Sequence, residues 1–167
     1  IIQPKYGILT NIGSVHDEGF ANREAKIKEK IKLFENCSDI FLEKNTEIEV
    51  LLPENSQKHT WSFSDESANL FVSKKNENGK TELTFKNAAS TFSVNIPFSD
   101  ENSIENVITC VNFMLFLGKE IAFIQNRVAE LYSVELRLQA KKGINNCLVI
   151  DDSYSVDYQS LKIALDF

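Results

Sequence analysis

The sequence predicts an α/β domain in which a mostly parallel sheet is covered by helices. Short apolar runs alternate with a helix-like segment near the start, period-2 segments fill the middle, and an amphipathic segment follows them. The chain has 167 residues, of which 43% are hydrophobic. This length and composition suit one domain, or one domain and a piece of another.

The first part of the chain has the order strand, helix, strand. Residues 6–12 form an apolar run that predicts a short buried strand. Residues 22–35 predict a helix, because apolar residues recur there at i, i+4 and i+7 among Lys and Glu. Residues 39–42 predict a second strand. This order is the βαβ unit of α/β folds.

The middle of the chain changes in character. Residues 44–66 are polar and contain Pro53, and we expect them to be irregular. Residues 68–97 alternate with period 2, which predicts an antiparallel meander of three strands with one covered face. The segments 76–79 and 87–90 carry turn residues between these strands.

The last part of the chain predicts helices and a strand pair. Capping residues at 99–102 begin an amphipathic helix that Gly118 ends. The other expected elements are a helix over 120–131, strands over 137–142 and 147–150, and a helix from Ser160.

Composition excludes some functions. With 18 Lys and Arg against 24 Asp and Glu, the net charge of -6 argues against nucleic-acid binding. A nucleotide is still allowed, because Mg²⁺ and a few placed cations can hold one triphosphate. No apolar run approaches 18 residues, so we expect no membrane span. The three cysteines form no CxxC pair, which favours free thiols in a reducing cytoplasm.

The polar segment after the first strand, residues 10–20, is the most informative one. It reads Thr-Asn-Ile-Gly-Ser-Val-His-Asp-Glu-Gly-Phe and contains His16. A lone loop histidine is usually an ordinary surface residue. However, α/β folds place ligands beyond strand ends, and imidazole is a common metal ligand, so this segment predicts a phosphate or metal site. His59 has no such context.

Other candidates are weaker when taken alone. Lys26, Lys28, Lys30 and Lys32 fit a solvated helix face with pairs such as Glu24–Lys28. Asn102 and Asn106, four residues apart, share one side of a helix start, where amides can contact a nucleotide or simply cap the helix.

Two further candidates lie near the end of the chain. Arg137 is an isolated strand arginine whose guanidinium suits phosphate oxygens. Asp152 belongs to the acidic strand-end run Ile-Asp-Asp-Ser-Tyr over residues 150–154.

These segments occur in the order of motifs in the Mur ligases, the ATP-dependent enzymes that build the peptide stem of the bacterial cell wall. Residues 10–20 resemble their TNIGxAHxExF signature. Residues 150–154 resemble the motif that opens the C-terminal domain of the members that add D-alanyl-D-alanine. Residues 59–62, 96–98 and 103–106 are similar to a form fused to alanine racemase.

The resemblance implies a domain organisation. Residues 1–133 would be the C-terminal part of a central P-loop-type ATP-binding domain that includes the 68–97 meander. Residues 134–167 would begin a Rossmann-like C-terminal ligase domain. No GxxxxGK[ST] phosphate loop occurs in the chain. We therefore expect an internal fragment, inactive alone, whose phosphate loop precedes Ile1.

The resemblance also implies roles for individual residues. His16 and a carbamylated Lys30 would hold Mg²⁺, with Lys28 as the alternative lysine. Asn102, Asn106 and Asp152 would contact ATP. Arg137 would meet phosphate charge, and His16, Lys30 and Arg137 would form the catalytic set.

The implied reaction joins D-Ala-D-Ala to UDP-MurNAc-tripeptide through an acyl phosphate, for peptidoglycan synthesis in the cytoplasm. One alternative is another Mur-fold ligase, acting at a different stem-peptide step or on folylpolyglutamate, which residues 152–154 would distinguish. A second is a non-catalytic module that binds a protein through the meander, which His16 and Lys30 would distinguish. The sequence carries no signal for an oligomeric state or for the third residue of the stem peptide.

Overall fold

The computed structural model describes residues 3–12, 19–77, 79–132, 139–151, 161 and 165. The chain forms two compact units, Ile1–Leu131 and Tyr132–Phe167, which are described separately.

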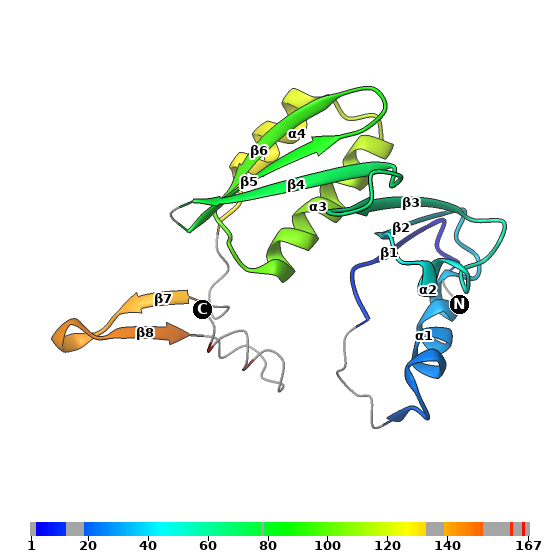
Figure 1. The fold of residues 1–167 in the computed structure, drawn as a ribbon, viewed down its shortest axis with the longest axis horizontal. Coiled ribbons are helices and arrows are strands. Elements are labelled where there is room, and N and C mark those ends of the chain that lie inside the picture. Colours follow the sequence, from blue (N-terminus) through cyan, green and yellow to red (C-terminus); the bar gives the residue numbers. More distant parts are fainter. Residues whose placement is uncertain are drawn as a thin grey trace. The chain divides into compact units, whose positions relative to one another are not determined.

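The first unit is built on one six-stranded mixed sheet (Figure 1). The strands lie in chain order, and neighbouring strands are parallel from β1 to β4 and antiparallel from β4 to β6. The predicted α/β class and the predicted meander are therefore confirmed. The strands are β1 (Tyr6–Leu9), β2 (Asp39–Glu43), β3 (Gln57–Ser62), β4 (Leu70–Glu77), β5 (Lys80–Lys86) and β6 (Thr91–Ile96). The helices are α1 (Arg23–Ile31), α2 (Thr46–Glu49), α3 (Glu101–Phe116) and α4 (Ile121–Ala129).

Helix α1 covers one face of β1 and β2. It begins where the Asn22 side chain accepts a hydrogen bond from the amide of Ala25 at 2.8 Å. Its apolar stripe continues into the 3₁₀ turn Lys32–Phe34. This stripe packs with the inward-facing residues of the two strands, and the cluster contains Leu9, Ile27, Ile31, Phe34, Ile40 and Leu42.

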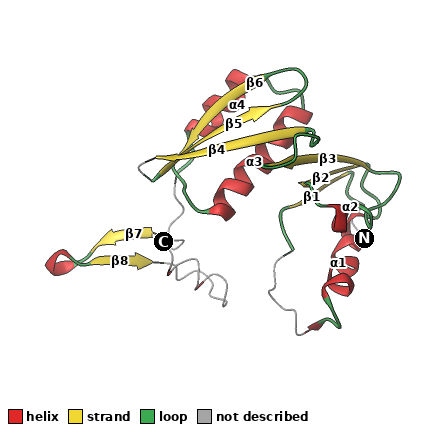
Figure 2. Ribbon diagram, viewed as in Figure 1, coloured by secondary structure: helices red, strands yellow, loops and turns green. Residues whose placement is uncertain are grey.

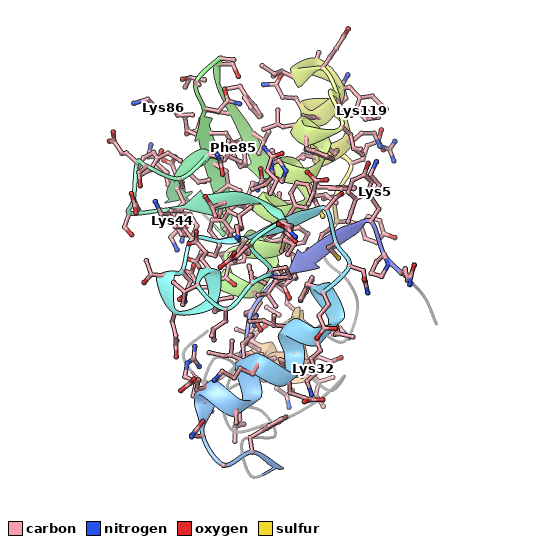
Figure 3. All side chains as sticks on the ribbon, turned by 90° about the vertical axis from the view of Figure 1, so that its right-hand side faces the viewer. Lys5, Lys32, Lys44, Phe85, Lys86 and Lys119 are labelled. Carbon is pink, nitrogen blue, oxygen red and sulfur yellow. The ribbon has the colours of Figure 1, made fainter. Side chains whose placement is uncertain are left out.

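Helices α3 and α4 cover the other face, along the meander (Figure 2). Asp100 caps α3 by accepting a hydrogen bond from the amide of Ser103 at 2.8 Å, and Gly118, with φ 69°, follows its end. The core on this face contains Trp61, Val72, Leu83, Phe85, Ile104, Ile108, Val111 and Ile124. In Figure 3 the label of Lys32 marks the α1 side and that of Lys119 the turn between α3 and α4.

An aromatic group joins α3 to the parallel strands. The ring of Phe41 stacks on that of His59 with centroids 4.7 Å apart and meets Phe113 and Phe116 edge-on. His59 Nε2 lies 2.9 Å from Asp39 Oδ1, and its carbonyl accepts a hydrogen bond from Asn112 Nδ2 at 3.0 Å. The Ser38 hydroxyl and then His59 hold the pKa of Asp39 below its ordinary value. The contacts with Asp39 and Asn112 thus give the ring and the carbonyl of His59 hydrogen-bond partners inside the fold.

The prediction that residues 44–66 are irregular was wrong, because α2 and β3 both lie there. Helix α2 is a single turn that depends on its cap, so it has no apolar periodicity to detect. Strand β3 is polar in its first half and escapes a period-2 search. It is nevertheless central, because it pairs with β2 on one side and with the start of β4 on the other.

The outer face of the meander is polar. Oppositely charged residues lie across from each other at Lys75–Glu82 and at Glu77–Lys80. No large hydrophobic side chain is exposed in the described residues of β4, β5 and β6. The described residues of this face therefore form a polar surface, without an apolar patch of large side chains.

The second unit contains an antiparallel hairpin of β7 (Gln139–Lys142) and β8 (Leu148–Asp151). The turn between them includes Asn145 and Asn146, both with positive φ. The strand pair is confirmed for the described residues. The helix expected from Ser160 falls mostly outside them, although Leu161 and Leu165 are helical.

The remaining global expectations concern thiols and membranes. Cys37, Cys110 and Cys147 are free, as expected. In the part of the chain that the structure describes, no helix is both long and apolar enough to cross a bilayer.

The close packing around Gly7 can be tested by adding a methyl group there. A Cβ there would lie 2.7 Å from Cε1 of Phe34 and 3.0 Å from Sγ of Cys37. We expect Gly7→Ala to lower the free energy of unfolding by about 1–3 kcal/mol, because a well-packed core does not accept an added methyl group. Urea denaturation measures this. Gly19→Ala is the control, since a Cβ at Gly19 would meet nothing within 4 Å. Equal stability of the two variants would contradict this account of the packing.

Candidate functional site

A pocket of about 160 Å³ opens where β1 and β2 end. It is lined by Leu9, Thr10, Asn11, Ile12, Arg23, Glu43, Asn45 and Ile48. Because the two strands are parallel, their carboxyl ends meet at one edge of the sheet, which is where α/β folds bind ligands. The polar segment after the first strand therefore begins at this pocket, as its position in the sequence predicted.

One wall of the pocket is held by Asn45. Its side-chain oxygen accepts hydrogen bonds from the amides of Glu47 at 3.0 Å and Ile48 at 3.4 Å. In return, the Glu49 carboxylate accepts one from the amide of Asn45 at 2.9 Å. This reciprocal capping fixes α2 immediately after β2.

Arg23 joins three parts of the pocket. Its Nη1 donates to the carbonyl oxygen of Ile12 at 3.3 Å, and its Nε donates to Glu47 Oε2 at 3.2 Å. Arg23 is the first residue of α1, so it connects the end of the β1 segment, the start of α1 and α2.

Lys44 is turned to the loop after β3 and does not line the pocket. Its amide donates to the carbonyl of Trp61 at 2.8 Å, and its Nζ lies 3.1 Å from Asp65 Oδ2 and also contacts the Ser67 hydroxyl. Ser67, followed by Lys44, lowers the pKa of Asp65 to about 2. The positive charge at the end of β2 is thereby neutralised.

Glu43, which lines the pocket, interacts electrostatically with a second carboxyl group, that of Glu105. Burial raises the pKa of Glu43, which ends β2. Burial also raises the pKa of Glu105 on α3, and the negative charges of Glu43 and Glu101 add to this while Lys74 opposes it. The interaction of Glu43 with Glu105 shows that the start of α3 lies near the carboxyl end of β2. Neighbouring α3 residues are thus candidates for the same ligand.

The structure places only some of the predicted site residues. His16, Arg137 and Asp152 lie outside the described residues. Lys30 is exposed on α1, and Asn102 and Asn106 are exposed in the first turns of α3. Within the described ranges, no hydrogen bond or ion pair joins Lys30 to either asparagine.

The predicted solvated lysine run needs one correction. Lys28 and Glu24 form the expected ion pair at 2.6 Å, and Lys32 pairs with Glu29. Lys26, however, is only 2% exposed, because it follows the buried face of α1 next to Ile27. A run of alternating lysines does not reveal which of them lies on the buried face of the helix.

Sequence reasoning missed Arg23, Glu43 and Asn45. Glu43 and Asn45 come directly after the apolar run of β2, so the strand-end rule that selected residues 10–20 would also have found them. Arg23 carried no local signal, because its role depends on the distant carbonyl of Ile12.

The Mur ligase middle domain matches residues 1–114 of the chain. The chain belongs to the Mur ligase family. A curated relative from Escherichia coli (strain K12), UDP-N-acetylmuramoyl-tripeptide–D-alanyl-D-alanine ligase, is 24% identical over 172 residues, covering 99% of this chain and 38% of that protein. The UDP-N-acetylmuramate–L-alanine ligase of Fusobacterium nucleatum is 34% identical over 126 residues, covering 70% of this chain and 26% of that protein.

Solved structures of the family share the fold. MurF from Acinetobacter baumannii superposes with a TM-score of 0.82 at 20% identity, covering 98% of this chain and 37% of that one. MurF from Thermotoga maritima in complex with ADP gives a TM-score of 0.77 at 18% identity, covering 98% of this chain and 38% of that one. The Mur ligase chain thus spans well under half the length of these relatives.

Glu105 offers a pH test of the site's electrostatics. Its folded-state pKa is raised above the ordinary 4.5, so stability falls as the pH rises from the unfolded-state pKa through that raised value. We expect Glu105→Gln to be more stable than wild type near neutral pH. The difference should vanish below the unfolded pKa, where Glu105 is protonated in both states. Thermal unfolding between about pH 4 and 7 measures this, with exposed Glu54→Gln as control. A constant difference across this range would contradict the assignment.

Proposed function

We propose that this Mur ligase chain is part of an enzyme that adds D-Ala-D-Ala to UDP-MurNAc-tripeptide. The observation that carries the proposal is the extent of the similarity to the Escherichia coli D-alanyl-D-alanine ligase. It covers 99% of the chain, and so takes in the second unit and its Ile-Asp-Asp-Ser-Tyr segment at residues 150–154.

The chain supplies one part of the machinery under this proposal. No GxxxxGK[ST] loop occurs among its 167 residues, so the γ-phosphate of ATP must be held by other parts of the longer enzyme. Residues 1–133 would complete the central ATP-binding domain, and residues 134–167 would begin the C-terminal domain. The chain alone would be inactive, and the whole enzyme would work in the bacterial cytoplasm.

The pocket would hold Mg²⁺ only with ligands from outside its lining, because no group of three or more His, Cys, Asp or Glu among the described residues could hold a metal ion. Thr10, Asn11, Glu43 and Asn45 bring oxygen atoms to its wall, and oxygen is the ligand atom that this cation prefers. His16 and Lys30, as a carbamate, would hold the ion. Mg²⁺ supplies neutralisation of the phosphate charge that develops during transfer to the peptide carboxylate.

The protein's own residues would bind and orient the substrates. Asn102 and Asn106, which are exposed in the first turns of α3, would contact the base or ribose of ATP. Asp152 would add a contact from the C-terminal domain, and Arg137 would meet phosphate charge. Catalysis is then positioning of the carboxylate, the γ-phosphoryl group and the dipeptide amine. The carboxylate oxygen would take the phosphoryl group from ATP, which gives an acyl phosphate and ADP. The amine would then attack the acyl carbon, so that the amide bond forms as phosphate leaves and the amine loses a proton.

A different stem-peptide step is the second candidate. The Fusobacterium nucleatum relative that is named as an L-alanine ligase has the higher identity, 34%, although over fewer residues.

The reaction test uses the full-length protein that contains this chain. We expect phosphate release from ATP to require both UDP-MurNAc-tripeptide and D-Ala-D-Ala. His16→Ala should lower the rate by more than the roughly 10–100-fold that is typical when a group supporting a metal ligand is removed, because His16 would itself be a ligand. Release with UDP-MurNAc and L-alanine instead would favour the second candidate. No release with either pair would overturn the ligase assignment.

The roles of Lys30 and Lys28, which lie on the same helix, can be distinguished by substituting each of them by alanine. We expect Lys30→Ala to abolish phosphate release and Lys28→Ala to keep the wild-type rate, since Lys28 is held in an exposed pair with Glu24. Wild-type activity should also fall when CO₂ and bicarbonate are removed, because carbamylation consumes CO₂. Loss of activity in Lys28→Ala alone would move the role to that residue.

A further inference from the structure

The buried face of α3 carries two polar side chains among apolar ones. Asn112 is 6% exposed and Thr109 is 3% exposed. The other buried residues of the helix are apolar: Ile104, Val107, Ile108 and Val111. Thr109 Oγ1 donates to the carbonyl of Glu105 at 2.9 Å, inside the helix. Asn112 Nδ2 donates to the carbonyl of His59 on β3 at 3.0 Å, and this bond joins the helix to the sheet.

The bond from Asn112 fixes the helix along its own axis in a way that apolar contacts do not. Apolar packing is non-directional, whereas a buried amide that loses its partner is left unpaired, which is unfavourable. Carbonyl groups on the same side of a strand repeat about every 6.6 Å, which is twice the rise per residue. One helical turn is about 5.4 Å. Sliding α3 to the next carbonyl would therefore put its apolar stripe out of step with the core.

Contacts at both ends of α3 show its direction on the sheet. Phe113 and Phe116 meet the ring of Phe41 edge-on, with centroids 5.0 and 5.1 Å apart. Near the start of the helix, Glu105 is within electrostatic reach of Glu43, the last residue of β2. Helix α3 therefore runs antiparallel to β2, and its first turns lie toward the carboxyl end of that strand.

The position of Asn112 is transmitted to the start of the helix. Helix α3 is continuous over Glu101–Phe116 and is capped by the Asp100 side chain. Asn106 and Asn102 precede Asn112 by six and ten residues, which is about 9 and 15 Å along the axis. Because an unbroken α-helix keeps its rise per residue, an axial shift at Asn112 would move both asparagines by the same amount.

We propose that Asn112 is a positioning residue, which sets the register of α3 against β3 and so places Asn102 and Asn106 for contact with ATP. This role rests on the proposed function, because the nucleotide contact belongs to that proposal. Asn112 acts through the helix and does not itself touch the nucleotide. Contacts with the base and ribose are made equally before and during phosphoryl transfer, so a misplaced helix start would raise the KM for ATP rather than lower kcat.

The experiment measures phosphate release by the full-length protein at varied ATP and at varied D-Ala-D-Ala. Asn112→Leu removes the amide and places an apolar side chain of similar size in an apolar core. We expect it to raise the KM for ATP about tenfold, the effect of about one lost hydrogen bond, with the KM for D-Ala-D-Ala unchanged. Asn112→Gln, which keeps an amide on a longer side chain, should lie between Asn112→Leu and the wild type.

Thr109→Val is the matched control. It removes a polar group from the same buried face, and the bond that it breaks lies within α3. Thr109→Val should therefore keep the wild-type KM for ATP. A helix that is merely destabilised would affect both variants alike, so the melting temperature is measured for each of them.

A second measurement reports the register without any nucleotide. Burial, and then the charge of Glu43, raise the pKa of Glu105. The gain in stability from Glu105→Gln near neutral pH therefore depends on where α3 lies along the sheet. We expect this gain to be smaller in the Asn112→Leu background than in the wild type, and unchanged in the Thr109→Val background.

The outcomes separate this inference from the proposed function. Equal KM values for ATP in Asn112→Leu and Thr109→Val would overturn the positioning role while leaving the ligase intact. An unchanged gain from Glu105→Gln in the Asn112→Leu background would overturn it as well, even in a protein that releases no phosphate. Absence of ATP-dependent phosphate release in the wild type would overturn the proposed function, and with it the nucleotide role of α3.

Discussion

The close approach of the Phe34 ring to the backbone of Gly7 is the contact on which the first unit's site depends. It sets how far α1 can sink onto β1, and the apolar stripe of α1 then fills the remaining space against β2. Since α1 is the crossover between two parallel strands, its position decides where its first residue, Arg23, meets the end of β1. The position of the pocket therefore depends on packing beyond the opposite end of α1.

The change from parallel to antiparallel pairing divides the sheet into two functional parts. The parallel strands bring their carboxyl ends to one edge and form the pocket. The antiparallel meander adds no pocket residue, but its covered face supports α3 and α4. Through α3 it holds Glu105 within electrostatic reach of Glu43. The meander thus contributes to the site by placing a helix start next to a strand end.

Regular periodicity allowed much of this fold to be predicted. The stripes of α1 and α3 and the alternation of β4, β5 and β6 were visible in the sequence, since each repeats over several turns or residues. Strand β3 was not, because its first half is polar and the His59 ring finds its partner, Asp39, only in the folded chain. A pocket does lie at the strand end where the sequence predicted a ligand site, and the roles predicted for individual residues stay predictions. The contact of Arg23 with Ile12 was missed because only the folded chain brings them together.

The single tryptophan of the chain lies at the junction of the two parts of the sheet. Trp61 is fully buried in the core under α3, pairs across from Glu43 on β2 and from Leu70 on β4, and its indole nitrogen has no hydrogen-bond partner. An indole in such dry surroundings emits at short wavelength. The intrinsic fluorescence of this chain therefore reports on one place, and a red shift would mark the separation of the parallel strands from the meander.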